Sequence, residues 1–154
     1  MIDGDELERS YKHHLSDYSE WEQSDHASDW VLIADNLGEA LSIDETMRQE
    51  DLVTILSNKA VHCKQGTIVS IVKGTKAEDI IEVLMQIPEK ERLKVKEVTM
   101  DLSSSMRAII SAVFPNAIIV LDCFHVLKRC HDAIEEVRLH LKRDAQVELR
   151  RQEI

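Results

Sequence analysis

The first half of the chain predicts three consecutive strands. Residues 41–44 (Leu-Ser-Ile-Asp) alternate between apolar and polar side chains, as a half-buried strand does. Residues 52–57 and 67–72 are rich in β-branched side chains and are separated by a loop that holds residues 64–66 (Lys-Gln-Gly). Because short connections join these three strands, we expect them to be antiparallel.

The second half of the chain predicts helices alternating with strands. Apolar positions recur with helical spacing from Thr75, a candidate cap, to Ile87, and Pro88 ends that helix. A strand at 95–100, a helix at 103–114 and a fully apolar strand at 117–121 follow, and the last resembles a parallel strand buried on both faces. A long helix is expected next, with an apolar stripe that we expect to be buried: Val126, Cys130, Ile134, Val137 and Leu141.

This order of elements predicts an α/β fold. The two strands that follow helices should be parallel by right-handed crossover, which gives a ribonuclease-H-like, five-stranded mixed sheet of order 3-2-1-4-5 flanked by helices. We expect this domain to span residues 39–154, after an acidic N-terminal arm at 1–38 with a short helix between Glu6 and Trp21. In that order the first and fourth strands are neighbours, which would bring Asp44 and Asp101 together.

Composition narrows the class of protein. The chain has 154 residues and is 44% hydrophobic, so it can bury a core, and it has neither a run of about 18 apolar residues nor a signal-peptide pattern. We therefore expect a soluble, cytoplasmic protein without a membrane partner. The three cysteines are an odd number without the spacing of a disulfide framework, which suits reduced thiols.

The net charge of −10 is concentrated at the N-terminal end. Residues 1–50 contain 14 acidic residues and three basic ones, a balance of −11, whereas the remainder is close to neutral. An acidic chain repels the phosphate backbone of DNA. If the substrate is DNA, other segments or chains must supply the basic contacts.

Two aspartates suggest a metal site. Asp44 and Asp101 each end a short run that should be a buried strand, where a lone carboxylate is costly unless a cation such as Mg²⁺ compensates it. Each also has a structural alternative, because Asp101 can cap the following helix and Asp44 can start a turn.

A second candidate cluster follows the last strand. Asp122 can cap the long helix, with Phe124 in the core and His125 bonded to the backbone. A zinc site built from Cys63, Cys123, His125, Cys130 and His131 is the other reading, but the sequence has no paired C-x₂-C spacing to support it.

An ordered set of motifs resembles a known family. The segments are 41–45 (LSIDE), 54–60 (TILSNKA), 72–75 (VKGT), 98–101 (VTMD), 114–117 (FPNA) and 122–126 (DCFHV). Together they resemble the ISL3-type insertion-sequence transposases, and more narrowly the bacterial branch in which the catalytic half is a separate reading frame.

The resemblance implies a ribonuclease-H-like DDE catalytic domain that uses two divalent ions, Mg²⁺ or Mn²⁺, on transposon-end DNA. The family's first two catalytic, metal-holding aspartates match Asp44 and Asp101, and its Asp-x-x-His element, in a supporting role, matches Asp122 and His125. Cys123 stands where the family usually has arginine. The family's third carboxylate, a Glu on a later helix, is expected beyond the end of this sequence, because Glu135 and Glu136 lie too early to match it.

Three readings of function follow. The favoured one is the N-terminal part of a transposase catalytic domain, truncated before the third carboxylate, inactive alone and served by a separate basic N-terminal transposase part. The alternatives are a stand-alone nuclease or resolvase with two aspartates, and a non-catalytic remnant that acts by protein association. A homodimer is left open.

Overall fold

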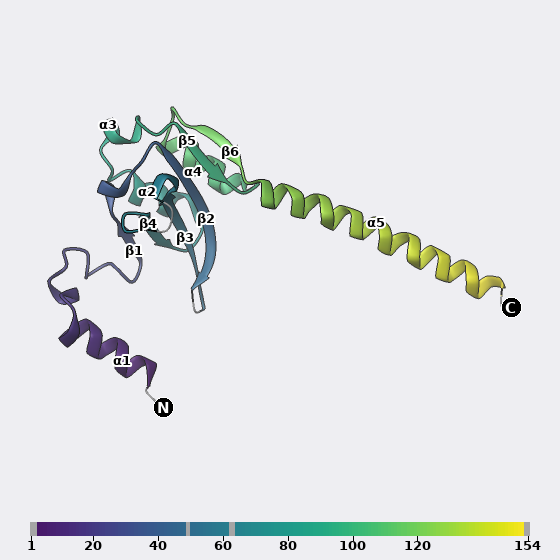
Figure 1. The fold of residues 1–154 in the computed structure, drawn as a ribbon, viewed down its shortest axis with the longest axis horizontal. Helices are drawn as coiled ribbons and strands as arrows, with labels where there is room; N and C mark the ends of the chain where they lie inside the picture. Colours follow the sequence, from purple (N-terminus) through teal and green to yellow (C-terminus); the bar gives the residue numbers. More distant parts are fainter. Residues whose placement is uncertain (1–2, 49, 62–63, 153–154) are drawn as a thin grey trace.

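The computed structural model describes residues 3–48, 50–61 and 64–152. Its centre is a six-stranded mixed sheet of order β1-β4-β3-β2-β5-β6 (Figure 1). The strands are β1 (Trp30–Leu32), β2 (Ala40–Arg48), β3 (Asp51–Asn58), β4 (Ile68–Lys73), β5 (Glu97–Met100) and β6 (Ile118–Leu121). The α-helices are α1 (Gly4–Ser10), α2 (Ala77–Leu84), α3 (Glu89–Arg92), α4 (Ser104–Val113) and α5 (Cys123–Gln152).

The five predicted strands occur in the predicted order, and one further strand is added. β2, β3 and β4 are antiparallel neighbours, while β2–β5 and β5–β6 are parallel. The additional strand, β1, comes from the N-terminal segment and pairs antiparallel with β4, with Trp30 opposite Val72. The brief apolar run at 30–34 was not recognised as a strand, and it is the edge of β4 that gives β1 its hydrogen-bonding partners.

The hydrophobic core lies between one face of the sheet and helices α2 and α4. Leu41 and Ile43 of β2 point into it, and both are almost fully buried. The helices contribute apolar side chains at helical spacing: Ile80, Val83 and Leu84 from α2, and Met106, Ile109, Ile110 and Val113 from α4. The N-terminal caps of both helices differ from those the sequence suggested. α4 is capped by Ser103 and not by Asp101, the cap that the sequence offered. α2 begins after Lys76 without a side-chain cap, so the predicted cap at Thr75 is wrong.

The opposite face of the sheet, which we call the open face, is covered only in part. Around β3 and β4 the N-terminal segment lies against it and encloses a cavity of about 360 Å³. Arm and sheet residues line this cavity, among them Lys12, Tyr18, Trp21, Arg48, Val53 and Ile71. At β6 the open face is bare, because 71% of Ile118 and 37% of Val120 are exposed. The prediction that this last strand is buried on both faces is therefore wrong, since it forms the edge of the sheet.

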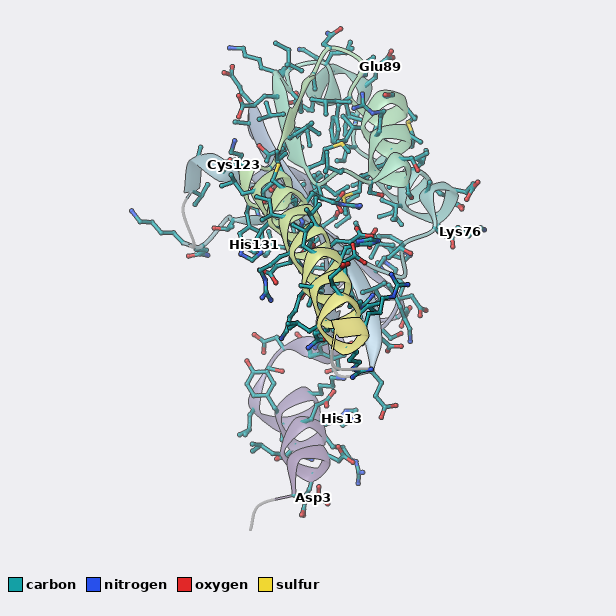
Figure 2. The ribbon with its side chains drawn as sticks, turned by 90° about the vertical axis from the view of Figure 1, so that its right-hand side faces the viewer. Asp3, His13, Lys76, Glu89, Cys123 and His131 are labelled. Atoms are coloured by element: carbon teal, nitrogen blue, oxygen red, sulfur yellow. The ribbon has the colours of Figure 1, made fainter. Side chains whose placement is uncertain are left out.

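The long helix α5 forms as predicted, but its apolar stripe is not buried. The helix extends away from the sheet (Figure 1), and in a view nearly along its axis its side chains radiate from all sides between Cys123 and the C-terminal end (Figure 2). Ile134 is 67% exposed, and the other four stripe residues are exposed to solvent or nearly so. Spacing identifies the apolar side of a helix but not the surface that will cover it. Within the described residues, no helix is both long and apolar enough to cross a membrane.

Candidate functional site

Strand register brings three aspartates to one level of the open sheet. Ser42 of β2 pairs with Thr99 of β5, so Asp44 and Asp101 each lie two residues beyond a register pair. Met100 pairs with Leu121, and the backbone N–H of Asp122 donates to the Met100 carbonyl at 2.8 Å. Adjacent strands are about 4.8 Å apart. The three aspartates therefore form one row, which we call the aspartate row, across β2 and the ends of β5 and β6.

Asp44 differs from its expected environment. It lies inside β2, which continues to Arg48, and its side chain is exposed. Because Leu41 and Ile43 face the core, alternation directs Ser42 and Asp44 to the open face. The argument that Asp44 is a costly buried charge is therefore wrong, and so is the alternative that it starts a turn. Its Oδ1 accepts the N–H of Glu45 at 2.9 Å, which is a local bond that leaves the carboxylate accessible.

Asp101 directly follows β5 and is half-buried. Its Oδ1 accepts the N–H of Ser103 at 2.7 Å, while Ser103 itself caps α4 by accepting the N–H of Met106. Asp101 is thus not the helix cap but fixes the turn that leads into it. Within the described residues, neither Asp44 nor Asp101 takes part in an ion pair.

The pKa of Glu45 reflects its burial and the negative charges of Asp101 and Asp44. Burial raises the pKa of the Glu45 carboxyl above its usual value, and the negative charges of Asp101 and Asp44 raise it further. Like charges placed close together disfavour ionisation in this way. Glu45 immediately follows Asp44 in the sequence, yet sequence reasoning did not single it out, because its coupling to Asp101 depends on the pairing of β2 with β5.

Asp122 and His125 lie at the start of α5. Asp122 Oδ1 accepts the N–H of Phe124 at 2.9 Å, which is the capping role considered from the sequence. Its other oxygen lies 3.9 Å from His125 Nε2, and both side chains are partly exposed. Phe124 is 65% exposed, so the prediction that it belongs to the core is wrong.

No cluster resembling a zinc site is present in the described part of the chain, where no three His, Cys, Asp or Glu side chains are arranged to hold one ion. Cys123 and Cys130 are exposed free thiols, and Cys63 lies outside the described residues. The aspartate row suits a different ion. Mg²⁺ commonly takes only one or two protein carboxylates and completes its shell with water and substrate phosphates. Asp44 and Asp101, which form no ion pair among the described residues, fit that requirement.

One basic residue next to this row was missed by the sequence analysis. Lys59 follows β3, and its Nζ donates to Glu97 Oε1 at 2.7 Å and to Thr99 Oγ1 at 2.9 Å, both on β5. The contact spans β2, which lies between β3 and β5. Lys59 lies in the segment 54–60 that contributes to the family resemblance, but the sequence assigned it no role, because its contact depends on the pairing of three strands.

The sheet order and the aspartate row together define a ribonuclease-H-like α/β domain with aspartates level on β2 and at the ends of β5 and β6. The chain matches the family model DDE_Tnp_ISL3, described as transposase, over residues 41–153. It therefore belongs to the ISL3-type DDE transposase family, as the motifs indicated. The match begins at β2, so β1 and the acidic arm lie outside it. No curated protein matches the chain.

Proposed function

We propose that this chain carries part of the catalytic site of a bacterial insertion-sequence transposase that cleaves DNA and transfers the cut strand with the help of divalent metal ions. The observation that carries the proposal is the aspartate row, in which Asp44 and Asp101 are level on adjacent parallel segments in a member of a transposase family. The substrate would be transposon-end DNA in the cytoplasm.

Each residue has a role in this proposal. Asp44 and Asp101 would hold Mg²⁺ or Mn²⁺, two ions in a complete site, and Asp122 with His125 would support them from the start of α5. Bound divalent ions supply Lewis-acid activation of water or of a 3′-hydroxyl and stabilise the leaving oxygen. Asp101 is suited to a fixed role, because its bond to Ser103 orients the carboxylate before any ligand binds. Asp44 is exposed and could share a metal ion with a substrate phosphate.

The charge distribution favours an enzyme in which catalysis and DNA recognition reside in separate parts. Residues 1–50 carry a balance of −11, which opposes DNA binding by this chain alone. We therefore propose that a separate basic N-terminal transposase part supplies recognition of the transposon end. A stand-alone nuclease would instead need a third ligand for the metal, and the described residues contain no such three-ligand group.

A paramagnetic ion tests the metal site without requiring activity. Mn²⁺ added to the labelled protein should broaden the NMR signals of residues next to Asp44 and Asp101, and Asp44→Asn should weaken the effect. Asp35→Asn is the matched control, because it removes the same charge from an exposed position outside the aspartate row. If Mn²⁺ broadens other acidic segments equally, or if Asp44→Asn leaves the pattern unchanged, the proposed site is wrong.

A further inference from the structure

Lys59 is held across the open face close to the aspartate row. The side chain starts just beyond β3, passes over β2 and ends on β5, where its ammonium group contacts Glu97 and Thr99. Val98 and Met100 point into the core, so alternation along β5 places Glu97 and Thr99 on the open face with Asp44. The Lys59 side chain is 39% exposed, so its ammonium remains accessible to a ligand.

The position of this cation relative to the carboxylates follows from strand geometry. Thr99 precedes Asp101 by two residues on the same segment, a rise of about 7 Å. The Lys59 ammonium lies 2.9 Å from Thr99 Oγ1 and is therefore about one strand repeat from the aspartate row. Consecutive phosphates along a nucleic-acid strand are separated by a similar length, so a strand with one phosphate at the row would bring a neighbour close to Lys59.

The hydrogen-bonding capacity of Lys59 leaves room for such a phosphate. An ammonium group has three N–H donors, and the contacts to Glu97 and Thr99 use two of them. The pair with Glu97 keeps the ammonium group on β5, and among the described residues Lys59 forms no ion pair with Asp44 or Asp101, where it would compete with a metal ion. Glu97 thus holds the charge beside the site while one donor stays available.

We propose that Lys59 binds a backbone phosphate of the DNA strand that lies at the aspartate row. Glu97 holds the ammonium group on β5 in the free protein and competes with the phosphate for it. The inference rests on the proposed function for the placement of that strand. The contact itself is independent of sequence, because phosphate contacts position a strand without reading its bases.

The test is DNA binding by the whole 154-residue protein, with an unrelated short duplex as probe at low salt in the presence of Mg²⁺. Lys59→Met should weaken binding several-fold and reduce the slope of log affinity against log salt by about one. Lys59→Arg should retain both properties. Lys96→Met is the matched control, since Lys96 forms a comparable exposed pair with Glu39 at 2.7 Å and should change the slope less.

A double-mutant cycle separates the phosphate contact from simple stabilisation of the sheet. Glu97→Gln releases the ammonium and removes a negative charge, so it should strengthen DNA binding. In the Lys59→Met background the same change should have a smaller effect, because no cation remains to be released. A structural ion pair would change thermal stability without this coupling in DNA affinity.

Three outcomes would overturn the proposal: equal effects of Lys59→Met and Lys96→Met, additive effects of the Lys59 and Glu97 changes, or no detectable DNA binding at low salt. Failure of the proposed metal site gives a different result. In that case Mn²⁺ would not broaden the signals near Asp44 and Asp101, while the coupling between Lys59 and Glu97 in DNA affinity would persist. If Mn²⁺ binds at the aspartate row but Lys59 and Glu97 are not coupled in DNA affinity, the proposed phosphate contact of Lys59 is wrong and the proposed metal site is unaffected.

Discussion

Ser42 and Thr99 are register partners in the parallel pair formed by β2 and β5, and Asp44 and Asp101 follow them at equal distance along the chain. The two aspartates belong to different halves of the sequence and lie level on neighbouring segments only because β5 pairs with β2, the first of three antiparallel strands. The pKa of Glu45, raised by burial and by the charges of Asp101 and Asp44, shows that this meeting concentrates negative charge. A divalent cation would relieve that repulsion.

Mg²⁺ should therefore lower the pKa of Glu45. A cation at the aspartate row offsets the charges that disfavour ionisation of the Glu45 carboxyl, so its titration should move back towards the usual value. NMR titration of the Glu45 carboxyl carbon with and without Mg²⁺ measures this directly. Asp44→Asn and Asp101→Asn should each reduce the effect of Mg²⁺, whereas Asp35→Asn should not. An unchanged Glu45 titration at saturating Mg²⁺ would argue against an ion at this row.

Replacing Glu45 by Gln should stabilise the fold at neutral pH. The pKa of Glu45 is higher in the folded state, so the folded protein binds this proton more tightly than the unfolded chain. The stability that Glu45 contributes is therefore present below its pKa in the unfolded chain, about 4.5, and is lost as the pH rises through its pKa in the folded protein. We expect Glu45→Gln to gain less than about 1 kcal/mol at neutral pH, because the group is partly exposed.

Urea unfolding of wild type and Glu45→Gln across pH measures this difference. The gain should disappear as the pH falls below the unfolded value, since both side chains are then neutral. Glu136→Gln, at an exposed position on α5, is the control and should change stability little at any pH. A gain that does not depend on pH would point to packing and not to charge.

Gly38→Ala should destabilise the entry into β2. A Cβ atom at Gly38 would lie 2.6 Å from Nδ2 and Oδ1 of Asn58. That side chain cannot move freely, because it donates to the carbonyl of Asn36 at 2.9 Å and accepts the N–H of Ala60 at 3.0 Å. We expect a loss of about 1–3 kcal/mol in the free energy of unfolding, measured by chemical denaturation. Gly4→Ala is the control, since nothing lies within 4 Å of the added atom.

The purified 154 residues should not carry out strand transfer with Mg²⁺. Among the described residues no three-ligand group holds a metal, and a missing carboxylate should raise the reaction barrier by several kcal/mol. A strand-transfer assay with the DNA flanking the reading frame, run beside Asp44→Asn, gives the measurement. Robust Mg²⁺-dependent cleavage that Asp44→Asn abolishes would favour a stand-alone nuclease instead.

Binding of duplex DNA by this chain alone should be weak. Affinity depends on the number of phosphates neutralised, and the acidic first 50 residues oppose binding. We expect a dissociation constant no tighter than roughly 10⁻⁵ M at physiological salt, which is near the non-specific range. Addition of the basic N-terminal part in trans should strengthen binding if the two associate. Nanomolar, sequence-selective binding by this chain alone would show that recognition does not reside elsewhere.

Particular residues show how far the sequence could be read. The alternation at 41–44 and the β-branched runs gave the strands, and the alternation of strands and helices gave their order, because both depend on local periodicity and on general rules of connection. β1 was missed since its partner strand, not its own three residues, makes it a strand. Asp101 was expected as a possible cap, yet Ser103 takes that role, and such a choice depends on local backbone geometry.

By itself, the sequence determined the mixed sheet, the level of Asp44 beside Asp101 and membership of a transposase family, because each follows from patterns within short segments and their order along the chain. Only the tertiary structure decided that Asp44 is exposed and not buried, that α5 leaves its apolar stripe uncovered, and that Lys59 reaches β5 across β2. Exposure and long-range contacts depend on which surfaces meet, and periodicity within one segment carries no information about its partner.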